Sequence, residues 1–133
     1  MQTYSVEVRR TDSYHARADV RDFTLPLGAR RADPTAGFNP VETLLSAVGD
    51  CLLTSLAHVA ESSRVAIEEA AVEVAAMRQE KPPLLTHIRY VLRIRSEAPD
   101  ERLGHLVDLA KTHSTVLQTV SQAVPVEGTW RRV

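Results

Sequence analysis

Cys51 is the residue of this sequence best suited to chemistry, and it is the only cysteine among 133 residues. A thiol becomes a strong nucleophile when it loses its proton. A lone cysteine cannot form a disulfide within its own chain, so this thiol is free. A cysteine among leucines and alanines is also a common small hydrophobic side chain of a helix interior. Two interpretations of Cys51 are therefore open, a reactive thiol and a structural side chain.

The sequence has no motif for a metal site, a nucleotide site or a serine hydrolase. The histidines have no close ligand spacing, and no Cys-x-x-Cys or His-x-x-x-His pattern occurs, which predicts no metal site. They are His15, His58, His87, His105 and His113. His58 follows Cys51 by seven residues, or about 10 Å along a helix, too far for direct proton transfer. No glycine-rich phosphate loop and no Gly-x-Ser-x-Gly elbow occurs, so the sequence predicts no cofactor, nucleotide binding or serine hydrolysis.

Composition and charge narrow the class of protein further. The formal net charge is -1 with acidic and basic residues interspersed, which disfavours nucleic acid as a partner. The longest apolar segment is interrupted by Glu42, Asp50 and His58, so we expect no membrane span. A single free thiol and the lack of an export leader after Met1 predict a cytoplasmic protein. The length and a hydrophobic content of 44% predict one domain over residues 1–133.

A long helix must position Cys51. Asn39 is a good N-cap, Pro40 suits the first helical position, and Glu42 stands where its side chain can bond back to the cap's backbone N–H. These signals and the apolar periodicity that follows predict a helix over residues 40–62. Its apolar residues cover about two thirds of the circumference, which predicts burial from several sides. They are Leu44, Leu45, Ala47, Val48, Cys51, Leu52, Leu53, Leu56, Val59 and Ala60.

Gly49 is an unusual choice for the middle of this helix. Glycine there costs about 1 kcal/mol relative to alanine. Its presence suggests the close approach of another backbone, such as a second copy of the same helix. The sequence thus gives a first indication of a dimer.

The other segments predict a mixed α+β fold. Alternating apolar residues over 6–25 predict a small antiparallel meander, followed by a surface loop at 28–37. Segment 66–79 combines helical composition with strand alternation, and we assign it as a strand because the clear strand at 84–95 needs a partner. One face of the latter strand is apolar and the other should meet water. The two sets are Ile88, Tyr90, Leu92 and Ile94, and His87, Arg89, Arg93 and Arg95.

Two helices and a last strand complete the expected order. Residues 99–113 have acidic residues at their start and basic residues at their end, which predicts a helix that complements its own dipole. Thr115 with Gln118 predicts a second capping box, which opens a short helix that ends at Pro125. Residues 126–133 are expected to form a final edge strand.

One motif is similar to that of a known family. It runs Asn39-Pro40-Val41-Glu42-Thr43-Leu44-Leu45 and continues with Ala47, Gly49 and Cys51 in a long apolar helix. This run resembles the central motif of the family of osmotically inducible protein C and the organic hydroperoxide resistance proteins (the OsmC/Ohr family), and the order of elements is similar over essentially the whole chain. The resemblance implies an α+β intertwined homodimer, with antiparallel sheets wrapped around a long central cysteine-bearing helix.

The resemblance also implies roles for individual residues. Cys51 matches the peroxidatic cysteine, whose thiolate attacks an organic hydroperoxide in that family. The family's second cysteine, which resolves the sulfenic acid as a disulfide, is replaced here by Ser114. A hydroxyl cannot form a disulfide, so an external thiol must then reduce the oxidised protein. We expect the Ser114 hydroxyl to be solvated or locally bonded, with lining of the binding pocket as the alternative.

The groups that activate the thiol in the family are harder to place. Glu42 matches the glutamate of one branch, while in the other branch the acid aligns with Val41. The capping role alone also accounts for Glu42, and nine residues turn it to the side of an ideal helix opposite Cys51. The family's best peroxidases use an arginine from the first strands, and none aligns securely here. The candidates are Arg9, Arg10, Arg17 and Arg21.

Two functions follow as hypotheses, and a purely structural dimer without a ligand is the third possibility. In the first, the protein is a thiol-dependent peroxidase in which Cys51 and Glu42 reduce an alkyl or lipid hydroperoxide with an external thiol reductant. In the second, it is a non-catalytic OsmC-like homodimer that binds a small apolar ligand. The missing second cysteine motivates the second hypothesis.

Overall fold

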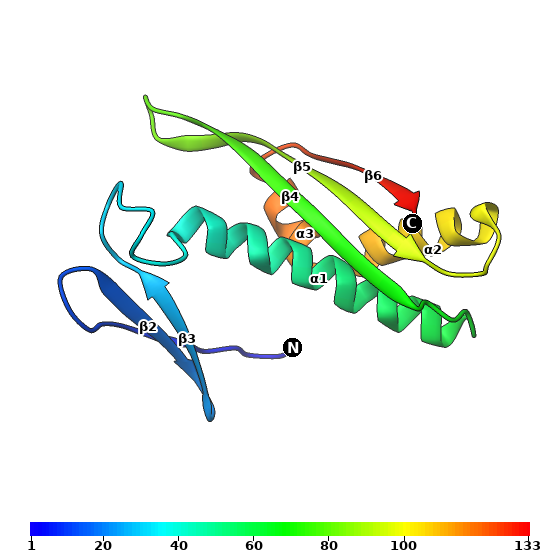
Figure 1. Cartoon of the computed structure of the whole chain (residues 1–133), viewed down its shortest axis with the longest axis horizontal. Coiled ribbons are helices and arrows are strands. Elements are labelled where there is room, and N and C mark those ends of the chain that lie inside the picture. Colours follow the sequence, from blue (N-terminus) through cyan, green and yellow to red (C-terminus); the bar gives the residue numbers. More distant parts are fainter. The chain divides into compact units, whose positions relative to one another are not determined.

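A computed structural model describes residues 1–133 as a mixed α+β chain with two three-stranded sheets and three helices (Figure 1). The elements are β1 (Glu7–Arg10), β2 (His15–Val20), β3 (Phe23–Gly28), α1 (Pro40–Ser62), β4 (Glu69–Gln79), β5 (Leu84–Arg95), α2 (Asp100–His113), α3 (Thr115–Ser121) and β6 (Val126–Arg132). They confirm the predicted order. The chain divides into two compact units, Met1–Leu44 and Leu45–Val133, which we call the first and second unit. The single domain expected from the length stays a prediction.

The first unit is the predicted antiparallel meander, with β2 between β1 and β3. A two-residue turn joins β2 to β3, and Arg21 in it adopts a positive φ of 52°. Only Ala36 in this unit is buried. Phe23 and Leu25 on β3 are 66% and 53% exposed. The small sheet therefore has no core of its own within the described chain.

The second unit is built on the sheet β4-β5-β6. The ambiguous segment is a strand, as predicted, and β4 pairs with β5 in antiparallel register, Val74 opposite Tyr90. β6 pairs with β5 in parallel, Gly128 opposite Tyr90. The expectation of purely antiparallel sheets is therefore wrong for this edge. β6 runs parallel to β5 because the connection through α2 and α3 returns the chain to the end where β5 starts.

The core of the second unit lies between the inner face of this sheet and the helices. Ile88, Tyr90, Leu92 and Ile94 of β5 are at most 3% exposed. Tyr90, Leu92 and Ile94 belong to one apolar cluster with residues of α1 and α2. The main helical members are Val48, Leu52, Leu56, Leu103 and Leu106. On the other face Arg89 and Arg95 are exposed, which confirms the predicted alternation of β5.

Helix α1 keeps the predicted bounds and serves as a core helix. Its length and composition alone would also allow it to cross a membrane, despite its three polar interruptions. Its most buried residues, such as Val48 and Leu52, pack in the cluster just described. A core helix of a water-soluble fold meets the same criterion of length and composition, so this finding adds no evidence for a membrane.

Gly49 has a neighbour other than the one suggested by the sequence. A Cβ atom at this position would lie 3.2 Å from Val72 Cγ1 and 3.4 Å from Val74 Cγ2, both on β4. The glycine therefore lets α1 approach a strand of its own chain. The close contact does not require a second copy of the helix, so this indication of a dimer is withdrawn.

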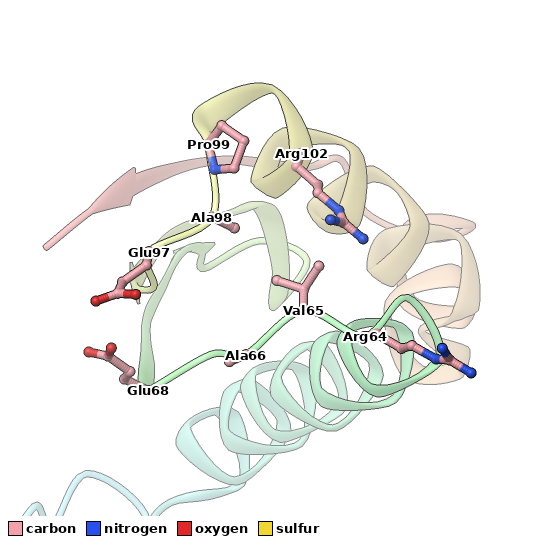
Figure 2. Close-up of a pocket in the computed structure, with 8 residues that line it drawn as sticks. All are labelled: Arg64, Val65, Ala66, Glu68, Glu97, Ala98, Pro99 and Arg102. Carbon is pink, nitrogen blue, oxygen red and sulfur yellow. The ribbon is translucent and has the colours of Figure 1, made fainter.

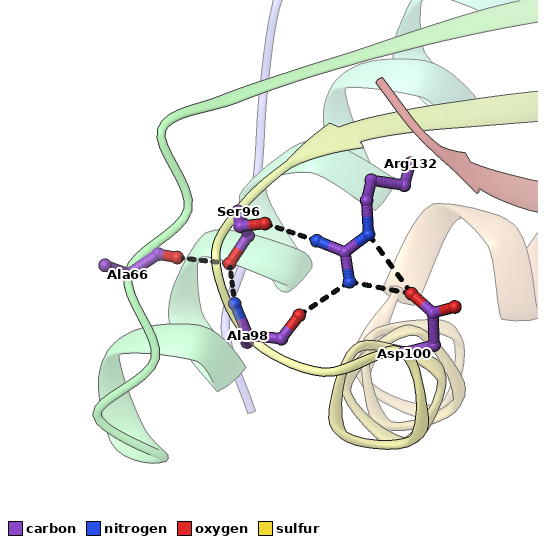
Figure 3. A network of polar contacts seen from close by, with 5 residues as sticks. All are labelled: Ala66, Ser96, Ala98, Asp100 and Arg132. Atoms are coloured by element: carbon purple, nitrogen blue, oxygen red, sulfur yellow. Dashed lines mark hydrogen bonds and ion pairs between the residues drawn. The ribbon is translucent and has the colours of Figure 1, made fainter.

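A polar network ties the last strand to the start of α2 (Figure 3). The Arg132 guanidinium donates to the backbone oxygen of Ser96, to that of Ala98 at 2.6 Å, and to Asp100 Oδ1 at 2.7 and 3.1 Å. The Ser96 hydroxyl donates to the Ala66 carbonyl at 2.7 Å and accepts the Ala98 N–H at 3.1 Å. These bonds fix the turn between β5 and α2 from two sides.

The second capping box is absent. Ser114, not Thr115, is the N-cap of α3, and it forms no side-chain cap bond. The Gln118 side chain instead donates to the Lys111 carbonyl at 2.9 Å, at the end of α2. The prediction failed because α3 follows α2 without a loop, so the orphan carbonyls of α2 compete for the same amide.

Gly128 provides a test of the packing between β5 and β6. A Cβ atom there would lie 2.0–2.2 Å from three atoms of the Tyr90 ring, which covers the glycine. Gly128→Ala should therefore lower the free energy of unfolding by about 1–3 kcal/mol, because the ring has to move within a packed core. Denaturant unfolding monitored by circular dichroism measures the change.

The matched control is Gly104→Ala on α2. A Cβ atom there would lie 3.6 Å from Trp130 Cζ2, its nearest neighbour, which is ordinary contact. The free energy of unfolding of this variant should rise by about 0.5–1 kcal/mol, because alanine favours the helix more than glycine does. Equal effects of the two substitutions would contradict the packing that we describe.

Candidate functional site

The predicted capping box forms at the start of α1. The Asn39 N–H donates to Glu42 Oε1 at 3.0 Å, and the Glu42 N–H donates to Asn39 Oδ1 at 2.8 Å. The Thr43 N–H donates to the Asn39 carbonyl at 2.9 Å. Two of the unpaired amides of the helix start are thus satisfied reciprocally. The Glu42 carboxylate is exposed and has a structural role at this end of the helix.

Cys51 lies on a flank of α1 that the chain covers only in part. The thiol-bearing residue is half-buried, whereas Leu52 beside it is 1% exposed. Seven residues make almost two helical turns, so Leu44, Cys51 and His58 follow one another along the same side of the helix. Leu44 is 38% exposed and His58 is exposed. The thiol-bearing residue is therefore not sealed in the core of the second unit.

Ser114 lies at the junction of α2 and α3 and is completely buried. Its backbone carbonyl accepts the Gln118 N–H at 2.9 Å, but its Oγ has no hydrogen-bond partner. The expectation of a solvated or locally bonded hydroxyl is therefore wrong. The direct succession of the two helices encloses the side chain, which a surface loop would have left in water. An unpaired buried hydroxyl is unusual and costs stability.

A contact between two histidines relates this junction to the flank of Cys51. The rings of His58 on α1 and His113 at the end of α2 lie with centroids 6.5 Å apart, in an edge-on arrangement of 78°. Because His58 is on the same side of α1 as Cys51, the end of α2 approaches that side. Ser114 follows His113 directly. The structure thus brings the Ser114 junction to the side of α1 that carries the thiol.

The candidate arginines of the first strands all have partners within the first unit. Arg9 pairs with Glu7 at 2.5 Å, Arg17 pairs with Asp19 at 3.0 Å, Arg10 donates to the Ser13 carbonyl at 3.4 Å, and Arg21 lies over the Phe23 ring at 5.6 Å. The hydrogen bond from Thr24 and the Arg17 guanidinium lower the pKa of Asp19 from its usual value. These contacts stabilise the strands of the meander.

Tyr90 is the titratable group buried most clearly in the second unit. Burial, with the Asp108 carboxylate as the smaller cause, raises the pKa of Tyr90 above its usual value. The phenol is therefore neutral at physiological pH. It can act neither as a base nor as an anion at the site.

A pocket lies at the far end of α1 from its cap (Figure 2). Its volume is about 210 Å³, and none of the predicted site residues lines it. The lining residues are Arg64, Val65, Ala66, Glu68, Glu97, Ala98, Pro99 and Arg102. Both arginine side chains lie on one side of the pocket, apart from each other, and both glutamates lie on the other side (Figure 2). Helix α1 ends at Ser62, about 16 Å along its axis from Cys51, so this pocket is separate from the thiol.

Comparison with protein families decides the classification. The family described as OsmC-like protein matches residues 32–128, which include Cys51 and Ser114. The chain belongs to the OsmC-like protein family. No curated protein matches the sequence significantly.

Solved structures of OsmC-like proteins share the fold. An OsmC-like protein from Mycoplasma pneumoniae is 18% identical with a TM-score of 0.90, and the match covers 99% of this chain and 98% of the other. The organic hydroperoxide resistance protein OhrB of Bacillus subtilis is 21% identical with a TM-score of 0.68 and 98% coverage of both chains. A further organic hydroperoxide resistance protein, from Elizabethkingia anophelis, is 15% identical with a TM-score of 0.75 and 99% coverage of both chains. These likenesses confirm the α+β fold of the OsmC/Ohr family for this chain.

Sequence reasoning missed two features of this OsmC-like protein. The contact between His58 and His113 joins residues that are 55 positions apart, and no local pattern reports such a pairing. The burial of Ser114 was missed because hydroxyl residues next to a helix start are usually solvated caps. The apolar neighbours Leu109, Ala110 and Leu117 were the only signal that this junction lies inside.

The unpaired hydroxyl of Ser114 leads to a stability test. Ser114→Ala should raise the free energy of unfolding by about 1 kcal/mol, since it removes a buried hydroxyl that bonds to nothing. Ser96→Ala is the matched control, because Ser96 is 7% exposed and its hydroxyl makes two hydrogen bonds. The free energy of unfolding of that variant should fall by about 2 kcal/mol. Thermal and urea unfolding should show changes of opposite sign in the free energy of unfolding of the two variants. A less stable Ser114→Ala protein would contradict the description of an unpaired hydroxyl.

Proposed function

We propose that this OsmC-like protein reduces organic hydroperoxides, alkyl or lipid, with Cys51 as its peroxidatic residue. The observation that carries the proposal is a half-buried thiol on the central helix of an OsmC-like fold, on a flank that is open in part. Two solved structures of the same fold are named organic hydroperoxide resistance proteins. The apolar flank residue Leu44, 38% exposed, suits a greasy substrate.

The reaction begins with the Cys51 thiolate. It attacks the distal oxygen of the hydroperoxide, the O–O bond breaks, and the alkoxide leaves as an alcohol after it takes up a proton. The sulfur is oxidised to a sulfenic acid. An external thiol then attacks this sulfur, forms a mixed disulfide and releases water. A second external thiol attacks this mixed disulfide. The attack frees the Cys51 thiol and joins the two external thiols in a disulfide.

Ser114 and Glu42 have supporting roles in this proposal. A serine at the position of the resolving cysteine prevents an internal disulfide, so each cycle consumes two external thiols. Ser114 is completely buried and does not contact substrate. Glu42 holds the start of α1 through its bond to Asn39. The need for a thiol pool supports a cytoplasmic location, where such pools are kept reduced.

The proposal is tested by the fate of Cys51. Stoichiometric cumene hydroperoxide should add one oxygen to the thiol, detected by mass spectrometry, and a dithiol reductant should restore turnover. Cys51→Ser should abolish peroxide consumption, because a hydroxyl is not oxidised under these conditions. Ser114→Ala should retain the reaction, because its hydroxyl takes no part in it. An unmodified thiol and no peroxide consumption by the wild-type protein would end the peroxidase proposal.

Loss of the resolving cysteine favours a second candidate, a non-catalytic dimer that binds a small apolar ligand. In this case a fatty acid should raise the melting temperature of wild-type protein and of Cys51→Ser alike, without peroxide turnover. No shift with fatty acids would contradict it. The partly open flank of α1 supports either candidate, so the peroxide assay separates them.

We also propose that the protein is a homodimer. The first unit exposes apolar residues on a sheet without a core, and such a surface is unstable in water unless a partner covers it. Sedimentation should therefore give a mass of about 29 kDa, twice the 14.7 kDa of one chain. Leu25→Lys should shift the protein towards monomer. Val133→Lys is the control, since Val133 is 51% exposed and Leu25 is 53% exposed, and equal effects of both would contradict the assignment of this face.

A further inference from the structure

The contact between His58 and His113 joins two side chains that could hold a common ligand. His58 is on α1 and His113 is the last residue of α2, and both helices are fixed by the apolar cluster that they share with β5. Their ring centroids are 6.5 Å apart. Both side chains are exposed to solvent. The two imidazoles are thus held together at the surface by a rigid framework.

The nitrogen atoms of both rings have no partner within the chain. His15 pairs with Asp12 at 2.9 Å and His87 contacts the Thr86 hydroxyl at 3.3 Å. Neither His58 nor His113 makes a hydrogen bond or ion pair, and their only specific contact is with each other. Each neutral imidazole therefore has one lone-pair nitrogen available to a ligand, two in all for the pair.

We propose that His58 and His113 bind one divalent transition-metal ion of the class that prefers imidazole, such as Zn²⁺ or Ni²⁺. Such ions bind neutral imidazole nitrogen at about 2.0–2.1 Å, which sets the two ring centres about 5 Å apart in a tetrahedral site. The observed 6.5 Å exceeds this by about 1.5 Å. Both side chains are exposed, so rotation about their side-chain torsions changes this separation without movement of either helix.

The charges around the pair also favour a cation. His113 ends α2, where the last carbonyl groups carry a partial negative charge. Glu61 lies one turn after His58 on α1, on the same side of that helix. Lys111, two residues before His113, points to the opposite side of α2. The electrostatic setting of the pair is therefore compatible with a bound dication.

The site is an open one with two protein ligands. No third histidine, cysteine, aspartate or glutamate joins the pair in a cluster of three. Water would then fill the remaining coordination positions, as in metal sites that exchange their ion or bind further ligands. Two ligands predict a modest, micromolar affinity and exclude a structural role in folding. The site is distinct from the thiol, since Cys51 is about 10 Å away along α1.

Calorimetric titration of the full-length protein with ZnCl₂ tests the proposal. We expect one ion per chain with micromolar affinity, and affinity that falls at acidic pH, because a protonated imidazole cannot bind a metal. His58→Ala and His113→Ala should each weaken binding on the order of 100-fold, because a single imidazole loses the advantage of chelation. Zinc should also raise the melting temperature of the wild-type protein and not that of either variant.

Two control variants make the outcome decisive. His105→Ala removes another exposed histidine of α2 and should leave zinc binding unchanged. Cys51→Ser should also leave it unchanged, which excludes the thiol as the ligand. Binding that survives both His58→Ala and His113→Ala, that is lost in Cys51→Ser, or that is absent from the wild-type protein would overturn the proposal. None of these outcomes depends on peroxidase activity.

Discussion

The apolar inner face of β5 is the surface on which the second unit depends. Its four alternating side chains are almost fully buried, and three of them, Tyr90, Leu92 and Ile94, belong to the cluster that α1 and α2 share. This single strand therefore sets the positions of both helices that carry residues of interest. Cys51 and His58 are placed by α1, and His113 and Ser114 by the end of α2. A glycine on each side of the framework, Gly49 facing β4 and Gly128 beneath Tyr90, lets the layers approach closely.

Much of this architecture could be predicted because its signals are local. The start of α1 follows from Asn39, Pro40 and Glu42, and the capping bonds formed as expected. The alternation in β5 identified its buried face, since strand side chains point to opposite sides in turn. The parallel pairing of β6 could not be predicted in this way, because register between distant strands depends on the path of α2 and α3 and not on the letters of β6. The prediction for Ser114 was wrong for a related reason, because two helices that meet without a loop bury the residue between them.

The chemistry of the site is limited by what surrounds the sulfur. Helix α1 offers Cys51 no cationic neighbour, and the thiol lies too far from the helix start to benefit from its dipole. The arginines of the first strands are paired with Glu7 and Asp19 or with groups of their own sheet. In the proposed reaction the thiol relies on its partial exposure and on the apolar flank beside it. The family, recognisable from the run before Cys51 and matched over residues 32–128, therefore defines the fold more firmly than the reactivity.

The enclosed hydroxyl at the junction of α2 and α3 has a genetic consequence. Serine and cysteine differ there by one atom. Burial without a hydrogen-bond partner costs a thiol less free energy than a hydroxyl, because a thiol is a weak donor. The surroundings of Ser114 would therefore accept sulfur more readily than the oxygen they now hold. One nucleotide change between serine and cysteine codons would suffice for this exchange. A lineage can in this way lose or regain a second thiol at this place without rebuilding the scaffold around it.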